Sequence, residues 1–131
     1  MKTILVDAVD AFVVENADGS FSIFREMQEL LDGYENRKIL LTGANDEQYK
    51  EFGLDKMPYE VFTLKHDPEK TDPEYYRRML KHFGLAAGDV VYFEHNPEAA
   101  KSAESVGIKT LYYNPEKRDL NELKKFLDEG L

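Results

Sequence analysis

The chain has 131 residues, of which 42% are hydrophobic and 33% charged, as expected for a single globular domain spanning residues 1–131. Its 26 Asp and Glu outnumber its 17 Lys and Arg, and the net charge of −9 argues against a nucleic-acid partner. The absence of cysteine excludes disulfide and thiolate chemistry. With no recognisable membrane-spanning segment or signal peptide, we expect a cytoplasmic protein without a membrane partner.

The first predicted element is a buried strand over Thr3–Val6, which runs directly into Asp7. A continuous apolar run of this kind is typical of a strand buried on both faces of a parallel sheet. Ligands bind at the carboxyl ends of such strands, so Asp7 is a nucleophile, a metal ligand or the cap of the following turn. Two short apolar runs, 11–14 and 21–24, flank Asp18-Gly19 and predict a β-hairpin.

Helices and strands are predicted to alternate through the rest of the chain. Polar capping residues before apolar positions at helical spacing indicate the helices, and short continuous apolar runs indicate the strands. The predicted helices lie at about 23–32, 45–53, 72–84, 96–107 and 119–128, and the strands at 38–42, 59–63, 90–93 and 109–113. This alternation predicts an α/β fold with a mainly parallel five-stranded sheet and helices on both faces.

Polar side chains follow three of the predicted strands. Asp7, Thr42 and Glu94 each come at a strand's carboxyl end, and Lys70 precedes the helix that leads into the fourth strand of the sheet. Because parallel strands end at the same edge, we expect these groups to converge. Two carboxylates suit a hard cation such as Mg²⁺, whereas a hydroxyl and a lysine suit phosphate oxygens.

The order of these motifs, over residues 4–113, resembles the haloacid dehalogenase (HAD) superfamily, which consists mostly of phosphatases. The resemblance implies a three-layer Rossmann-like fold whose hairpin is a mobile flap. It also implies catalytic roles for Asp7, Thr42 and Lys70, phosphate binding by Thr42, Gly43 and Lys70, and Mg²⁺ binding by Asp7, the Val9 carbonyl and Glu94. In this family the aspartate that ends the first strand is the nucleophile.

The chain departs from the family pattern near both acids. The family's general acid stands two residues after the nucleophile, where this chain has Val9, and losing such a group costs about 10²- to 10⁴-fold in rate. Asp10 comes one residue too late and is expected to point elsewhere unless the turn is altered. The fourth motif reads Glu94-His95-Asn96 instead of paired aspartates. Asp10, His95 and Asn96 are therefore candidate accessory residues.

Two further features leave alternatives open. Lys65, in Lys65-His66-Asp67-Pro68, competes with Lys70 as the motif lysine, although no helical pattern follows it directly. Residues 11–41 and 43–69 are too short to contain the cap domain that many relatives insert there. Capless relatives tend to act on large substrates or to close the site with another subunit. The resemblance therefore implies a phosphorylated substrate, with a macromolecule as one candidate, and leaves a homo-oligomer open.

Three functions remain open at this point. The first is a phosphohydrolase that works through an aspartyl-phosphate, slowly because Val9 cannot transfer a proton. The second is a catalytically inactive binding or scaffold domain, which the altered positions Val9, His95 and Ala99 favour. The third is a dehalogenase-like hydrolase, because Asp7-Ala8 and Asn96 resemble the motifs of that metal-free branch.

Overall fold

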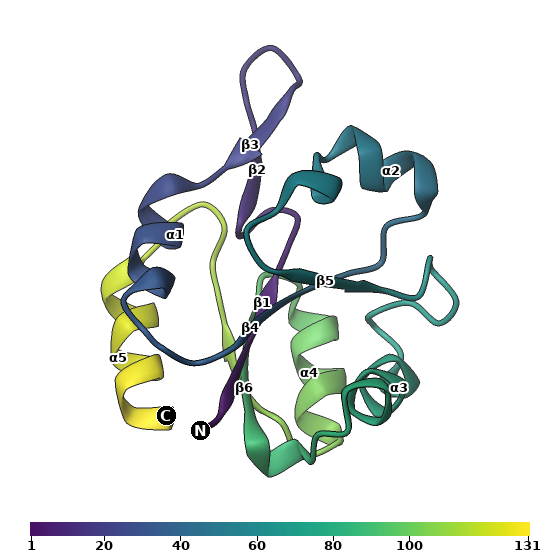
Figure 1. The fold of residues 1–131 in the computed structure, drawn as a ribbon, viewed down its shortest axis with the longest axis vertical. Helices are drawn as coiled ribbons and strands as arrows, with labels where there is room; N and C mark the ends of the chain where they lie inside the picture. The colour runs from purple at the N-terminus through teal and green to yellow at the C-terminus, as the bar shows by residue number, and fades with distance from the viewer.

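The computed structural model describes all 131 residues (Figure 1). The strands are β1 (Thr3–Asp7), β2 (Val13–Glu15), β3 (Phe21–Ile23), β4 (Lys38–Thr42), β5 (Glu60–Thr63), β6 (Val90–Glu94) and β7 (Lys109–Tyr112). The helices are α1 (Arg25–Asp32), α2 (Asp46–Glu51), α3 (Pro73–Phe83), α4 (Pro97–Ser105) and α5 (Leu120–Gly130), with short 3₁₀ turns at Leu54–Lys56 and Ala87–Asp89.

Five strands form one sheet in the order β5-β4-β1-β6-β7, and every neighbouring pair is parallel. The chain first builds outward from β1 through β4 to β5, and then returns to the other side of β1 for β6 and β7. The strand order therefore reverses at β1, which is where open α/β sheets bind their ligands. The expected α/β fold with a parallel five-stranded sheet is confirmed.

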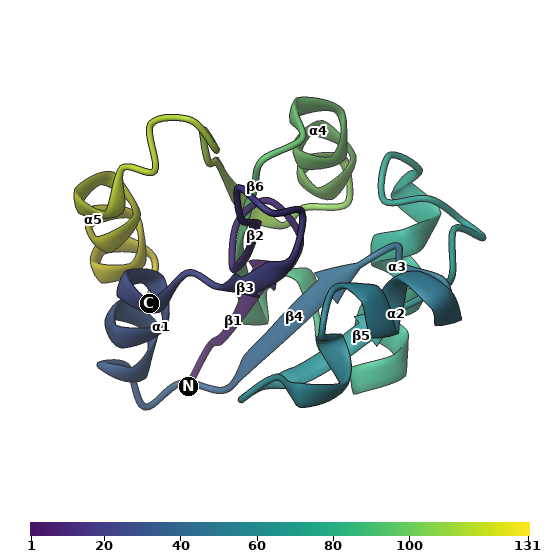
Figure 2. The same ribbon diagram turned by 90° about the horizontal axis from the view of Figure 1, so that it is seen from above.

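The sheet is covered on both faces, which makes three layers (Figure 2). Ile4 and Val6 of β1 belong to a core cluster with residues of α1 and α5, whereas Leu5 belongs to a cluster with residues of α3 and α4. Alternate residues of a strand point to opposite faces, so β1 is apolar throughout because it supplies both cores.

The helix signals in the sequence act as expected. Asp72 caps α3 by accepting a hydrogen bond from the Glu74 backbone N–H at 2.9 Å, and Pro73 occupies the first turn. Gly84 ends this helix with φ +65°, a conformation that favours glycine. The last helix, α5, continues to Gly130, two residues further than its apolar periodicity indicated.

The predicted hairpin is present as the antiparallel pair β2–β3, separate from the main sheet. Figure 1 shows it projecting beyond the carboxyl ends of the parallel strands. The Phe21 ring packs edge-on against Phe52, with centroids 4.7 Å apart, and so fastens the hairpin to the segment after α2. No cap domain is inserted after the hairpin or between β4 and α3.

The two chain termini lie side by side at the amino ends of the strands (Figure 1). The Lys2 ammonium donates a hydrogen bond to the Gly130 carbonyl oxygen at 2.9 Å, which ties the start of β1 to the end of α5. None of the helices is long and apolar enough to cross a membrane.

Candidate active site

Two buried carboxylates lie together where the strand order reverses. Asp7 ends β1 and Glu94 ends the adjacent strand β6, and the two residues are 1% and 0% exposed. Isolated buried charges are costly, so such a pair is stable only where opposite charges and hydrogen-bond donors surround it. The neighbouring loops supply these groups.

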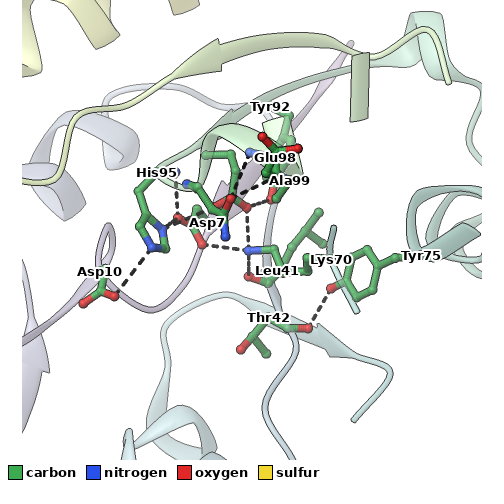
Figure 3. A network of polar contacts seen from close by, with 12 residues as sticks. Asp7, Asp10, Leu41, Thr42, Lys70, Tyr75, Tyr92, His95, Glu98 and Ala99 are labelled. Carbon is green, nitrogen blue, oxygen red and sulfur yellow. Dashed lines mark hydrogen bonds and ion pairs between the residues drawn. The ribbon is translucent and has the colours of Figure 1, made fainter. Parts of the chain in front are cut away.

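Lys70 bridges the two carboxylates. Its Nζ atom lies 2.8 Å from Asp7 Oδ1 and 2.6 Å from Glu94 Oε1, and it also donates to the Leu41 carbonyl oxygen at 3.3 Å (Figure 3). The competing Lys65 instead forms an exposed ion pair with Asp46 at 3.0 Å. The structure thus brings Lys70, rather than Lys65, to the carboxylates.

His95 contacts both acids from another direction. Its backbone N–H donates to Asp7 Oδ2 at 3.0 Å, and its ring Nδ1 also contacts Asp7 Oδ2. The same Nδ1 lies 3.3 Å from Glu94 Oε2. The sequence identified His95 only as an accessory candidate, yet it contacts both carboxylates.

The position of Asp10 differs from the expectation that its side chain points away from the site. It points back into the site, where its Oδ2 lies 3.5 Å from His95 Nε2 (Figure 3), and not away from it. The turn after Asp7 is tight, because the Phe12 N–H donates to the Asp7 carbonyl at 3.2 Å, and Asp10 adopts φ +72° within it. Aspartate tolerates this left-handed conformation better than most residues, and the reversal redirects its side chain.

The remaining contacts of Glu94 come from its own strand and the loop after it. The Tyr92 hydroxyl donates to Glu94 Oε1, and the Asn96 backbone N–H donates to Oε2 at 2.9 Å. The Asn96 side chain accepts hydrogen bonds from Glu98 N at 2.9 Å and Ala99 N at 3.3 Å, so it caps α4. Asn96 therefore has a structural role here whatever else it does.

These contacts shift the pKa values of all four groups. Burial and then the charge of Glu94 raise the pKa of Asp7. Burial opposes ionisation of Glu94 as well, but the Lys70 ammonium and hydrogen bonds hold its pKa well below the usual range. Burial would lower the pKa of Lys70 and His95, but the two carboxylates outweigh it, so that of Lys70 rises further and that of His95 rises to about 10. Lys70 and His95 are therefore held in their charged forms beside the two acids, of which Glu94 ionises more readily than Asp7.

Thr42 and Gly43 lie across the cavity from β6, at the end of β4. The Thr42 hydroxyl accepts a hydrogen bond from the Ala44 N–H at 3.1 Å, and its carbonyl accepts one from the Tyr75 hydroxyl at 2.8 Å. These bonds fix the loop that follows β4. A Cβ atom added to Gly43 would lie 3.4 Å from His66 Nδ1, so this side chain of the next loop stands at ordinary contact distance from the position.

A cavity of about 210 Å³ connects these groups. Its walls include, with the exception of Lys65, the site residues suggested by the sequence: Asp7, Val9, Asp10, Thr42, Gly43, Lys70, Glu94, His95 and Asn96. Residues that sequence reasoning missed complete the rim, among them Gln48, Phe52, His66 and Glu69. His66 holds this rim together, because its ring nitrogens lie 2.5 Å from Gln48 Oε1 and 2.9 Å from Glu69 Oε1. No local motif marks these residues, which converge only through loop conformation.

No protein-family model and no curated protein matches the sequence, but solved structures match the fold. An uncharacterized protein from Listeria monocytogenes serotype 4b superposes with a TM-score of 0.71 at 12% identity, over 99% of this chain and 98% of that one. A HAD family enzyme from Bacteroides thetaiotaomicron, an aspartate-to-alanine mutant in complex with magnesium and inorganic phosphate, gives a TM-score of 0.65 at 12% identity, over 88% and 95% of the two chains. The chain has a HAD-like fold.

The HAD-like fold is shared with larger proteins too. A 2-haloacid dehalogenase from Pseudomonas syringae superposes with a TM-score of 0.65 at 19% identity. The match covers 85% of this chain but only 55% of the dehalogenase. At such identities the likeness concerns the HAD-like fold alone, so any activity has to be argued from the site itself.

The acidic cluster of this HAD-like fold has some of the features of a divalent-cation site. Ligand atoms of Asp7, Glu94 and His95 lie within 4.8 Å of one another, and carboxylate oxygens are ligands that Mg²⁺ prefers. Val9 also lines the cavity, and its carbonyl accepts no hydrogen bond within the chain. The donor types fit a metal, and donors of the chain contact the same carboxylate oxygens.

Proposed function

We propose that the chain is a HAD-type hydrolase that uses Asp7 to attack a phosphate ester. The observation that carries this proposal is the position of Asp7, which lies beside the Lys70 ammonium at the floor of a polar cavity. A carboxylate nucleophile needs a cation nearby to offset the negative charge of a phosphoryl group, and Lys70 supplies it.

The proposed reaction has two steps. The Asp7 carboxylate attacks phosphorus and the ester oxygen leaves with the bonding electrons, which produces an aspartyl-phosphate and an alkoxide that takes up a proton. Lys70, the Thr42 hydroxyl and the region of Gly43 would hold the phosphoryl oxygens. Water then attacks the intermediate, releases inorganic phosphate and restores the carboxylate of Asp7.

The reaction is proposed to be slow, because Val9 occupies the position of the family's general acid. Its isopropyl side chain can neither donate nor accept a proton, which is expected to cost about 10²- to 10⁴-fold. Asp10 and His95 line the same cavity as Val9 and are the candidate groups for proton transfer in its place.

Mg²⁺, which the resemblance implies, takes no part in either step of the proposed reaction. Asp7, Glu94 and the Val9 carbonyl are the groups that would hold it, and it would supply additional positive charge at the phosphoryl oxygens. In the arrangement observed, His95 contacts both carboxylates on the side away from Lys70. The proposed chemistry therefore relies on the cations that the chain itself provides.

The absence of a cap domain favours a large substrate. Active sites that close over a small substrate exclude water with a lid, and here the rim of the cavity carries only short segments, among them Gln48 and Phe52 of the α2 region and His66 and Glu69 of the loop after β5. We propose a phosphorylated macromolecule, or closure of the site by a second copy of the chain.

Turnover of an aryl phosphate ester by metal-free and Mg²⁺-supplemented protein tests the proposed function. Asp7→Asn is expected to lower the rate by at least about 10³-fold, because an amide is a poor nucleophile. Glu69→Gln, at the rim of the same cavity, is the matched control and should retain most of the activity. Chloride release from a 2-haloacid, measured in parallel, would point to the dehalogenase alternative instead.

A binding or scaffold role is the second candidate, and one observation favours it. Hydrogen bonds within the chain engage both oxygens of Asp7, so the carboxylate is stabilised in its resting state. A folded sample that turns over neither substrate class, and whose melting temperature rises with a phosphorylated ligand, would support this role over catalysis.

A further inference from the structure

The carboxylate oxygens of Asp7 and Glu94 are all hydrogen-bonded within the chain. Lys70 Nζ contacts one oxygen of each residue, Asp7 Oδ1 at 2.8 Å and Glu94 Oε1 at 2.6 Å. The other two oxygens face His95, whose Nδ1 contacts Asp7 Oδ2 and lies 3.3 Å from Glu94 Oε2. The Tyr92 hydroxyl and the Asn96 N–H complete the set around Glu94.

The imidazole of His95 thus stands at the point where both carboxylates meet, on the side opposite Lys70. A hard divalent cation shared by two carboxylates lies within about 2.0–2.6 Å of an oxygen from each. That space is filled by the Nδ1 atom, and the position is fixed by the His95 backbone N–H, which donates to the same Asp7 oxygen at 3.0 Å.

Lys70 makes a second cation on this site more difficult to accommodate. It lies within 2.8 Å of both acids with a side chain that is 14% exposed, so its charge is little screened by water. A metal would have to displace His95 while remaining close to this ammonium group. The Tyr92 hydroxyl on Glu94 would have to move as well if that carboxylate rotated toward a metal.

We propose that the His95 imidazole takes the place that a divalent cation would occupy between Asp7 and Glu94, so that the site is assembled without a metal. This role of His95 concerns the same site as the proposed function, and its consequence for catalysis rests on that function. The rival arrangement, in which His95 is itself a metal ligand beside the two acids, predicts the opposite response when the ring is removed.

Calorimetric titration with MgCl₂ of chelator-treated protein separates the two arrangements. The native chain should bind Mg²⁺ weakly or not at all, and His95→Ala should bind it at least about 10-fold more tightly, within the range over which groups around a site change metal affinity. His66→Ala, a histidine on the rim of the same cavity, is the matched control and should leave Mg²⁺ affinity unchanged.

Weaker Mg²⁺ binding by His95→Ala than by the native chain would show that His95 is a ligand and would overturn the proposal, as would equal affinity of the two proteins. If His95→Ala does not fold alone, circular dichroism during the same titration asks whether Mg²⁺ restores the fold, which the proposal requires. His95→Asn, which keeps a short N–H donor, should show an intermediate gain. These readouts involve no turnover, so they stand even if the chain proves to be no hydrolase.

Discussion

Two segments of the chain share the pattern Lys-x-Asp-Pro, and they differ completely in structure. In residues 65–68, Lys65 and His66 adopt positive φ angles of +53° and +66°, and the lysine pairs with Asp46 at the surface. In residues 70–73, the aspartate and proline begin α3, and the Lys70 side chain enters the buried site.

The difference comes from the residues that lie directly after each segment. Beyond residue 73 the apolar positions Tyr76, Met79 and Leu80 recur at helical spacing and pack on the sheet, so the aspartate becomes a helix cap. Beyond residue 68 no such pattern exists. The same four-residue pattern therefore positions a site residue only where a packed helix anchors it, and the two segments provide matched controls for one another.

The largest expected difference concerns the two lysines. Lys70→Met leaves two buried carboxylates with one partner fewer and should lower the free energy of unfolding by about 3–5 kcal/mol. Lys65→Met breaks an ion pair whose side chains are 60% and 83% exposed and should cost about 0–1 kcal/mol. Urea denaturation measures both. Adding Glu94→Gln to Lys70→Met should recover part of the loss, and equal costs for the two single variants would contradict the buried network.

The next contrast concerns pH. The pKa of His95, raised from 6.5 to about 10, means that its stabilising contribution is fully present below pH 6.5 and is lost as the pH rises toward 10. The free energy of unfolding should fall on the order of a few kcal/mol across that interval. His95→Asn should flatten the profile, whereas His66→Asn, in the exposed segment, should leave it in place. A native profile that is flat between these values would be inconsistent with the His95 contacts.

A smaller difference is expected for the two aspartates. Asp72→Ala removes the cap of α3 and should cost about 1 kcal/mol. Asp67→Ala, in a segment where no helix begins, should stay within about 0.5 kcal/mol. Thermal or urea denaturation of both variants provides the comparison, and a larger cost at position 67 would reverse the interpretation of the two segments.

The smallest effect on stability is expected at Gly43, where residues 65–68 meet the cavity. In Gly43→Ala the new methyl group would lie 3.4 Å from His66 Nδ1 and 3.7 Å from Glu69 Oε2, which is ordinary van der Waals contact. The free energy of unfolding should change by less than about 0.5 kcal/mol. The free energy of phosphate binding, measured by calorimetry, should change by more than the free energy of unfolding. The methyl group narrows the cavity without straining the backbone.

The strands and helices follow closely from sequence because each has a local cause. The apolar run at 38–42 becomes β4 with those bounds, and Asn45 and Gln48 form the capping box expected before α2. The convergence of Asp7, Glu94 and Lys70 also follows, because parallel strands end at one edge. Their catalytic and metal-binding roles stay predictions, since proximity alone does not establish chemistry.

The features that the sequence did not reveal depend on backbone conformation in loops. Asp10 returns to the site only because it adopts a left-handed φ within the turn after Asp7, and no periodicity encodes that reversal. The contact of His95 with both acids likewise depends on the loop between β6 and α4. The rim residues His66 and Glu69 come from a polar stretch in which many chain paths are compatible with the same composition.

The neighbouring chain ends carry one practical consequence. Since Lys2 and Gly130 are hydrogen-bonded at the edge of the sheet remote from the cavity, a short glycine-rich linker can join the ends and new ends can be opened elsewhere. The exposed hairpin tip at Asp18-Gly19 is a suitable opening point, because the hydrogen bonds that cross it are local and solvent-exposed. Such a circular permutant would break the covalent link between β2 and β3 while leaving Asp7, Glu94, Lys70 and His95 unchanged, and so test whether the site depends on an intact hairpin.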